Sequence, residues 1–212
     1  MKLILLGAPG AGKGTQAFKL AKMLGVPAIS TGNMLRDAMK NGTEIGLKAR
    51  SYMDSGRLVP DEVVLGIVKE RLSQSDCADG YILDGMPRTI PQARALEEMG
   101  IHPDHVVSIE IADEVIEQRM TGRRVCGGCG AGYHTEARPP KEEGICDLCG
   151  TELTIRKDDD PETVKNRLKI FHAETEALKE FYAGFGIVRT VEGDRPMNEV
   201  TEAILRAIGV EA

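Results

Sequence analysis

Long apolar runs are absent from this sequence, and so is an excess of positive charge. The N-terminal apolar run, Leu3–Leu6, is far shorter than the roughly 20 residues of a membrane-spanning helix or the core of a signal peptide. We therefore expect no membrane partner and a cytoplasmic location. The formal net charge is −6, which disfavours a broad nucleic-acid surface because such a surface needs a positive field.

The composition is that of an ordinary globular protein. Charged residues make up 28% and hydrophobic residues 42% of the 212 residues, with 24 Gly and 10 Pro. These fractions disfavour a disordered or fibrous chain. The length suffices to bury a sizeable core, and we expect one domain that carries insertions.

A glycine-rich turn near the N-terminus carries the strongest chemical signal. It reads Gly7-Ala-Pro-Gly-Ala-Gly-Lys-Gly-Thr15 and leads into a helical pattern that begins near Lys13. Its glycines let several backbone N–H groups converge on one anion at a helix N-terminus, and Lys13 can reach the β- and γ-phosphates of a nucleotide. Gly14 stands where the common motif has Ser or Thr, so the usual hydroxyl ligand for magnesium is displaced. A plain chain reversal is the alternative interpretation.

Short apolar runs alternate with helical patterns along most of the chain. We predict strands at Leu3–Leu6, Pro27–Ile29, Tyr81–Leu83, Val106–Ile111 and Ile187–Val191. This alternation indicates parallel βαβ units and an α/β fold with helices flanking the sheet. Ligands of such sheets bind beyond the carboxyl ends of the strands.

The sequence also predicts two further helices and two segments that interrupt the alternation of strands and helices. Asp160-Pro161-Glu162 predicts a long helix that runs to about Tyr182, because Asp caps a helix and Pro suits its first position. Asp194-Arg195-Pro196 similarly opens a final amphipathic helix. Residues 30–59, which read as two short helices, and residues 122–159, rich in Gly, Pro and Cys, interrupt the alternation. We interpret both as insertions.

Four of the five cysteines form two Cys-x2-Cys pairs in the second insertion. Cys126 and Cys129 are followed, after sixteen residues, by Cys146 and Cys149. This is the spacing of a zinc ribbon, and four thiolates leave no open coordination position, so the metal would be structural. A disulfide pairing is the alternative interpretation. We expect the fifth cysteine, Cys77, to be a buried bystander.

Arginines bracket the cysteine-rich insertion. Arg119, Arg123 and Arg124 precede the cysteines, Arg156 follows them, and Arg167 lies on the next helix. Guanidinium groups bind phosphate oxygens bidentately, so arginines on both sides of a hinge would reach a transferring phosphoryl group when such a flap closes. Solvated surface charge is the alternative interpretation.

Five stretches together resemble the adenylate kinase family over nearly the whole chain. They are Gly7–Thr15, Ser30-Thr-Gly-Asn-Met-Leu-Arg36, Leu83-Asp-Gly-Met-Pro-Arg-Thr89, Gly122-Arg-Arg-Val125 and Arg156-Lys-Asp-Asp159. The resemblance implies a P-loop core with a five-stranded parallel sheet, made of residues 1–29, 60–121 and 160–212. It also implies two mobile insertions, an AMP-binding segment at 30–59 and a zinc-containing lid at 122–159, of the long bacterial type.

The resemblance further implies the reversible reaction MgATP + AMP = 2 ADP, carried out by a monomer with ATP, AMP and ADP as partners and with Mg2+ and structural Zn2+ as cofactors. ATP would bind at Gly10, Ala11, Gly12, Lys13, Gly14, Thr15, Arg123, Gly132, Tyr133 and Arg195. AMP would bind at Thr31, Arg36, Arg57, Leu58, Val59, Gly85, Met86, Pro87, Arg88, Gln92, Arg156 and Arg167. The catalytic residues would be Lys13, Asp84, Arg88, Arg123, Arg156 and Arg167.

This chemistry needs no general base, because the attacking phosphate oxygen is already ionised near neutral pH. It needs two repelling anions to be aligned and the charge of the transferring group to be neutralised. Asp84 ends an apolar run and is expected to hold the water shell of magnesium, with a simple Asp-Gly turn as the alternative. We also expect Asp158 and Asp159 to fasten the closed lid through its arginines.

Two residues depart from the family pattern. Asn33 stands where the family usually has Asp, and it keeps a polar cap without the charge. Met86 stands where the family usually has Phe, and it offers an apolar surface that could lie beside a base. We expect these changes to tune the affinity for the monophosphate and to leave the reaction unchanged.

Two other functions stay open. A kinase for UMP or GMP would share the glycine-rich turn and Asp84, although Gln92 and Thr31 favour adenine because an amide offers both a donor and an acceptor. A nucleotide-dependent zinc-ribbon module that binds nucleic acid is the second alternative. The mixed charge of residues 122–159 disfavours it.

Overall fold

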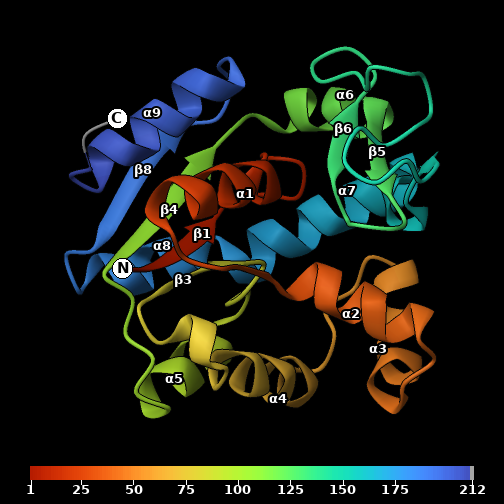
Figure 1. Cartoon of the computed structure of the whole chain (residues 1–212). Helices are drawn as coiled ribbons and strands as arrows, with labels where there is room; N and C mark the ends of the chain where they lie inside the picture. Colours follow the sequence, from red (N-terminus) through yellow and green to blue (C-terminus); the bar gives the residue numbers. More distant parts are fainter. Residues whose placement is uncertain (211–212) are drawn as a thin grey trace.

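A five-stranded parallel β-sheet forms the centre of the protein (Figure 1). The structure is a computed structural model that describes residues 1–210. The strands are β1 (Lys2–Leu6), β2 (Ala28–Ser30), β3 (Tyr81–Asp84), β4 (His105–Glu110) and β8 (Val188–Glu192). They lie in the order β2-β3-β1-β4-β8, and every pairing is parallel. The predicted fold class is confirmed, with each strand boundary within one residue of its expected place.

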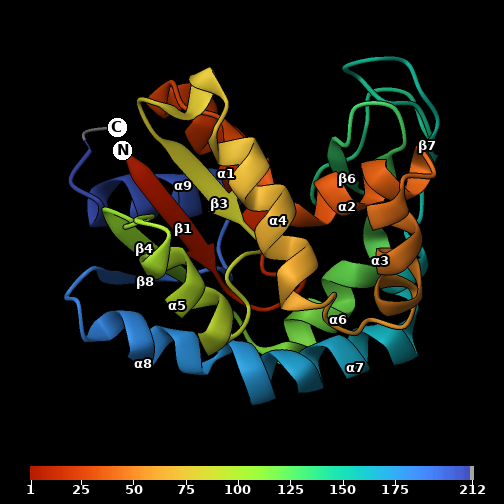
Figure 2. The same ribbon diagram turned by 90° about the horizontal axis from the view of Figure 1, so that it is seen from below.

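Helices cover both faces of this sheet (Figure 2). The α-helices of the described residues are α1 (Lys13–Leu24), α2 (Thr31–Lys40), α3 (Glu44–Asp54), α4 (Asp61–Leu72), α5 (Ile90–Glu98), α6 (Asp113–Gly122), α7 (Pro161–Ile170), α8 (Ala177–Ala183) and α9 (Met197–Ala207), of which α2 and α3 extend away from the sheet, beside the smaller sheet of residues 122–159 (Figure 2). Leu3 and Leu5 of β1 pack with α1 and α9, whereas Ile4 and Leu6 pack with α4, α5 and α8. Successive side chains of a strand point to opposite faces. Apart from Lys2, β1 is apolar, and it therefore contributes to both cores.

The sheet brings three segments together at its carboxyl edge. β1 runs directly into the glycine-rich turn, and β3 ends at Asp84, which lies opposite Leu5 in the register of the two strands. β2 ends at Ser30, opposite Asp84 on the other side. The start of residues 30–59, the end of β3 and the glycine-rich turn are therefore neighbours, at the edge where parallel sheets bind ligands.

A smaller antiparallel sheet lies within residues 122–159, here called the cysteine-rich segment. Its strands are β5 (Arg123–Cys126), β6 (Gly132–His134) and β7 (Leu153–Thr154), in the order β6-β5-β7. Its buried apolar cluster consists of Cys126, Tyr133, Cys146 and Leu153. Such a small core buries little surface, so this sheet needs a further source of stability.

Residues 161–183 form a helical rod with one wider turn in its middle (Figure 2). Asp160 caps α7 as predicted, because its carboxylate accepts hydrogen bonds from the N–H groups of Glu162 and Thr163, both at 3.2 Å. Between α7 and α8, residues Phe171–Thr175 are π-helical. The sequence analysis predicted an uninterrupted helix here, since a single π turn leaves no periodic or compositional signal.

Helices α2 and α3 approach each other closely at Gly46. A Cβ there would lie 2.1 Å from the carbonyl oxygen of Ala38, so we predict that Gly46→Ala lowers the free energy of unfolding by about 1–3 kcal/mol. The matched control is Gly66→Ala in α4, where a Cβ would meet nothing within 4 Å. Helix propensity predicts that this control stabilises the protein by about 0.5–1 kcal/mol. Denaturant unfolding measures both variants, and equal shifts would contradict the prediction.

Candidate active site

The glycine-rich turn wraps the start of α1, as its sequence predicts. The Nζ of Lys13 donates hydrogen bonds to the carbonyl oxygens of Gly7 at 2.7 Å and Ala8 at 2.8 Å. Gly10 and Gly12 have φ angles of 88° and 94°, which glycine adopts without strain. Burial lowers the pKa of Lys13 to about 8, although the nearby Asp84 opposes this shift. The ammonium group is thus placed to exchange carbonyl partners for anionic oxygens.

A second loop, residues 85–88, follows β3 and is held from several sides. The Thr31 hydroxyl donates to the carbonyl of Gly85 at 2.9 Å. Arg88 donates its backbone N–H to Gln92 Oε1 at 2.7 Å and its Nε to the Gly85 carbonyl at 2.8 Å. Gln92 is buried and donates from Nε2 to Asp61 at 2.6 Å. These bonds fix the direction of the Arg88 side chain.

Two aspartates at the end of the cysteine-rich segment pair with arginines. The Nε of Arg123 donates to Asp159 Oδ2 at 2.7 Å and its Nη2 contacts Oδ1, which makes a bidentate pair. The Asp159 side chain is 1% exposed. Arg167 of α7 lies 2.9 Å from Asp158 Oδ2 and 3.5 Å from Asp159 Oδ1. The predicted pairing with an arginine of residues 122–159 is confirmed for Asp159, whereas Asp158 pairs with Arg167 outside them. That these pairs fasten a closed lid stays a prediction.

Positive charge exceeds negative charge around these aspartates. Burial, with smaller contributions from Arg36 and Arg123, lowers the pKa of Arg156 to about 9, so this side chain stays charged at neutral pH. Its Nε is buried and has no hydrogen-bond partner within residues 1–210. A buried donor without a partner is costly, and a cluster of such cations suits a bound polyanion.

A cavity of about 70 Å3 opens between the glycine-rich turn and the arginines. Lys13 from α1, Arg88 from the loop after β3 and Arg167 from α7 all line it. Gly56 and Leu58 line it from residues 30–59. Three cations from elements far apart in the sequence therefore face one space.

The helical segment, residues 30–59, touches the cysteine-rich segment across the site (Figures 1 and 2). The Nζ of Lys40 donates to the carbonyl of Gly127 at 2.9 Å. A Cβ at Gly130 would lie 3.5 Å from the amide nitrogen of the Asn33 side chain. Asn33 also accepts a hydrogen bond from Arg36 at 2.8 Å. The two segments are therefore in direct contact, as a closed site requires.

Other residues that the resemblance assigned to AMP have varied surroundings. Arg57 lies over the ring of Tyr52 at 4.9 Å, Val59 is buried, and Pro87 lines the cavity. The side chain of Met86 is fully buried within the core. Gln92, assigned to the same nucleotide, is buried as well. The expectation that Met86 offers an apolar surface beside a base stays a prediction.

On the side assigned to ATP, Tyr133 is also buried. Its hydroxyl accepts a hydrogen bond from the N–H of Asp147 at 2.8 Å and lies 3.5 Å from Cys146 Sγ. The side chain of Tyr133 thus belongs to the small core. A ligand could contact only the backbone groups of Tyr133 and of the preceding Gly132. The guanidinium of Arg195 pairs with Glu192.

The bracketing arginines do not all converge. Arg119 donates to the carbonyl of Gly193 at 3.0 Å, and Arg124 donates to the carbonyl of Thr121 at 3.2 Å. Arg123 and Arg124 are neighbours on β5, so their side chains point to opposite faces. Only Arg123 of this adjacent pair can join Asp159, and the expectation of convergence is wrong for Arg119 and Arg124.

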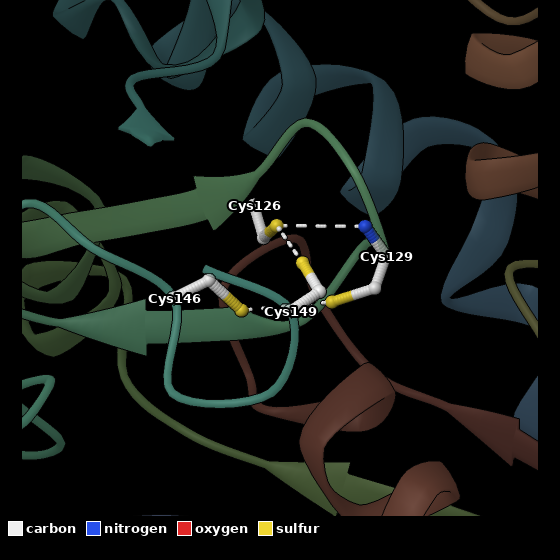
Figure 3. Close-up of side chains that lie close together, drawn as sticks. All are labelled: Cys126, Cys129, Cys146 and Cys149. Atoms are coloured by element: carbon white, nitrogen blue, oxygen red, sulfur yellow. Dashed lines mark hydrogen bonds between the residues drawn. The ribbon is translucent and has the colours of Figure 1, made fainter. Parts of the chain in front are cut away.

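The four predicted metal ligands come together at the end of β5 (Figure 3). Their Sγ atoms all lie within 4.8 Å of one another, with 3.3 Å between Cys126 and Cys149 and 3.6 Å between Cys129 and Cys146. Tetrahedral Zn–S bonds of about 2.3 Å place sulfur atoms about 3.8 Å apart, whereas a disulfide needs about 2.05 Å. Four free thiols in this arrangement fit one thiophilic ion and disfavour the disulfide alternative.

Asp61 orients part of the site, although no sequence pattern predicted this. Asp61 begins α4 and accepts hydrogen bonds from Gln92 Nε2 and from the Thr89 hydroxyl, at 2.6 and 3.2 Å. No motif surrounds Asp61 in the sequence. The sequence did indicate the two residues that Asp61 contacts. Thr89 and Gln92 have the spacing of a helix N-cap, and Thr89 caps α5 by accepting a hydrogen bond from the N–H of Gln92.

Comparison with known proteins decides the family. The family model for adenylate kinase matches residues 5–187. The chain belongs to the adenylate kinase family. It is 54% identical to an adenylate kinase of Caldicellulosiruptor saccharolyticus over 215 aligned positions, which cover 100% of both chains. It is 53% identical to an adenylate kinase of Lachnospira eligens over 213 positions, covering 99% of this chain and 100% of that one.

Membership in the adenylate kinase family makes this protein an enzyme of the phosphotransferase class. The glycine-rich turn and the converging cations are the parts that phosphoryl transfer needs. Within residues 1–210, no helix combines the length and the apolar character that crossing a membrane would take.

Asp158 gives this adenylate kinase fold a testable acid dependence. Burial raises the pKa of the Asp158 carboxyl, but Arg167 and Arg36 outweigh burial and hold it below its usual value of 3.8. A carboxyl with a lowered pKa stabilises the folded state above its unfolded-state pKa and loses that contribution as the pH falls below it. We predict that hydrogen-exchange protection of β5 is steady from about pH 7 to about pH 5 and falls below about pH 4.

Asp158→Asn should already lower this protection at neutral pH, by about tenfold, because it removes a charge-assisted contact. Asp79→Asn, at an exposed residue outside the cluster, is the matched control and should keep the wild-type profile. Wild-type protection in Asp158→Asn would contradict the prediction.

Proposed function

We propose that the protein transfers a phosphoryl group reversibly from MgATP to AMP and so forms two molecules of ADP. The observation that carries this proposal is the convergence of Lys13, Arg88 and Arg167 on one cavity beside a phosphate-binding turn. Similarity to adenylate kinases over the full length of the chain supports the same reaction. A nucleic-acid-binding module would have no use for this arrangement.

The proposal assigns one nucleotide to each side of the cavity. Residues 1–29, 60–121 and 160–210 form the core, 30–59 the mobile AMP-binding insertion, and 122–159 the mobile lid. The last two residues of the expected core, 211–212, lie outside the described residues. ATP binds at Gly10–Thr15, Arg123, Gly132, Tyr133 and Arg195, the last three through backbone groups. AMP binds at Thr31, Arg36, Arg57, Leu58, Val59, Gly85–Arg88, Gln92, Arg156 and Arg167.

Catalysis in this proposal is electrostatic. The attacking oxygen of AMP is ionised near neutral pH, since phosphate monoesters have a second pKa of about 6, and no side chain has to remove a proton. Arg123 and Arg167 exchange part of their contacts with Asp159 and Asp158 for phosphate oxygens. Together with Lys13, Arg88 and Arg156 they align the two anions and neutralise charge on the transferring group.

Asp84 fits the magnesium ion that accompanies ATP. It ends β3 at the carboxyl edge of the sheet, and a Cβ at Gly14 would lie only 3.3 Å from its Oδ2. The carboxylate thus lies against the phosphate turn, where it can hold water ligands of the ion by hydrogen bonds. When bound with ATP, Mg2+ would supply positive charge that offsets the charge of the phosphates.

Adenine recognition is assigned to Gln92. Its Oε1 accepts from Arg88 and its Nε2 donates to Asp61, so both ends of the amide are oriented by the protein. One N–H and one acceptor site remain, which is the pair that the edge of adenine complements. The choice of base therefore depends on the same side chain that holds the Arg88 loop.

The cysteine cluster is assigned a structural zinc ion. The small core of the cysteine-rich segment needs a further source of stability, and four thiolates close the coordination sphere. The ion would thereby hold β5 and Arg123 in place and help the lid to exclude water from the transferring group. We also propose that the enzyme is a cytoplasmic monomer, on the resemblance to its family.

The experiment that tests the reaction measures ADP formation from MgATP with AMP, UMP, CMP or GMP, and with no acceptor. We expect AMP to support a rate at least about tenfold above any other acceptor, because a site built for one hydrogen-bonding edge discriminates against others. Lys13→Met is the control for contaminating kinases and should be nearly inactive. If another monophosphate is preferred, the base assignment is wrong. If none reacts and the protein is retained on nucleic acid, the binding-module alternative replaces the proposal.

Metal loss should loosen the lid. We expect Cys149→Ser to hold less zinc, measured by mass, and to melt about 2–4 °C lower for each kcal/mol of stability that is lost. Cys77→Ser is the matched control, because Cys77 is buried outside the cluster beside Arg71, and it should retain its metal. A demonstrably metal-free protein with unchanged melting would contradict the structural role.

A further inference from the structure

Thr175 lies at the end of the π-helical turn and contacts the site without belonging to any motif. Its hydroxyl donates a hydrogen bond of 2.8 Å to the backbone carbonyl of Arg88, which is 87 residues away in the sequence. Thr175 also lines the cavity, together with Arg88 and Arg167. It is the one residue of Phe171–Thr175 whose side chain is hydrogen-bonded to the Arg88 loop.

The π turn explains why Thr175 reaches this position. Arg167 and Thr175 are eight residues apart, whereas two turns of an α-helix take about seven, so in a regular helix their side chains would be about 80° apart around the helix axis. The wider turn is closed by the N–H of Glu176, which donates to the carbonyl of Phe171 at 3.0 Å, and a π turn takes up one extra residue. With one residue taken up by the π turn, Arg167 and Thr175 are related as residues seven apart in an α-helix are. Both residues line the cavity.

His172, in the same turn, contacts two carboxylates. His172 lies 3.0 Å from Glu176 Oε2 and 3.0 Å from Asp113 Oδ2 at the start of α6. The π turn is therefore held from the solvent side by two carboxylates and from the cavity side by the Thr175 hydroxyl.

Arg88 and Arg167 need such a link because they repel each other. Burial lowers the pKa of Arg88, and the charge of Arg167 lowers it further, so the two guanidinium groups are close enough to interact. Their distance must nevertheless stay fixed if both are to contact one phosphoryl group. A neutral hydrogen bond to the Arg88 backbone joins the loop and the helix without adding charge to the site.

We propose that Thr175 is a positioning residue for phosphoryl transfer, which ties the Arg88 loop to the helix that carries Arg167. The backbone of Arg88 is then held on two sides, by Gln92 at its N–H and by Thr175 at its carbonyl. This inference rests on the proposed function, because it takes Arg88 to contact AMP.

The test compares Thr175→Val, which removes the hydroxyl and keeps the shape, with Thr175→Ser, which keeps the hydroxyl. Loss of one hydrogen bond predicts that Thr175→Val lowers kcat/KM for AMP by about 2- to 12-fold. We expect the KM for AMP to rise and the KM for MgATP to stay within about twofold. Thr175→Ser should restore the wild-type values. Thr190→Val, at an exposed position of β8, is the matched control and should change neither constant.

AMP binding by calorimetry gives a second readout that needs no turnover. Weaker AMP binding in Thr175→Val, together with recovery in Thr175→Ser, supports the inference. It does so even if the wild-type protein forms no ADP, because that result would contradict only the proposed reaction. A wild-type affinity and kcat/KM in Thr175→Val overturn the inference and leave the reaction standing. An equal loss in Thr175→Val and Thr175→Ser, with both KM values unchanged, also overturns it, because packing would then be the cause.

Discussion

Mutual repulsion among cations is the constraint on which the rest of this site depends. Around one region, the structure gathers more basic side chains than carboxylates within residues 1–210. The cations are Lys13, Arg36, Arg88, Arg123, Arg156 and Arg167, and the carboxylates are Asp84, Asp158 and Asp159. Two like charges about 4 Å apart repel by about 4 kcal/mol at an effective dielectric constant of 20. The aspartates offset part of this repulsion within the protein, and the phosphates of two nucleotides would offset the rest.

The fold meets this constraint by taking its cations from separate, well-supported elements. Lys13 begins α1 and is held by the turn before it, Arg88 follows β3 in a loop bonded on several sides, and Arg167 lies on α7. Arg123 begins β5, and the small sheet around β5 has too few apolar side chains to be stable alone. The cysteine cluster and Arg123 are therefore linked, because the metal that the cysteines fit would stabilise the strand on which Arg123 lies. A metal bound by the cysteines would thus help to keep the Arg123 guanidinium in place beside the cavity.

Much of the fold was predictable because its signals are local. Three patterns each predict the element in which they lie: the apolar run of β1, the glycines of the turn and the Asp160-Pro161 start of α7. The two Cys-x2-Cys pairs predict that their four thiols form one cluster. Contacts between distant segments left no such signal. Asp61 contacts the site through two hydrogen bonds, across 28 and 31 residues, and Thr175 through one, across 87 residues. The π turn that contains Thr175 has no sequence pattern. Arg124 was misjudged because a motif fixes the identity of a residue, whereas the packing of its neighbours fixes the direction of its side chain.

In the proposed reaction, these arginines act on the transferring charge and not only on binding. The single-turnover rate of ADP formation in Arg123→Met, with MgATP and AMP both saturating, tests this role. We expect a rate lower by at least about 100-fold, as when one preorganised donor of an electrostatic site is removed, with a much smaller loss of affinity for either nucleotide. A near-normal rate at saturation, with the whole loss in affinity, would contradict it.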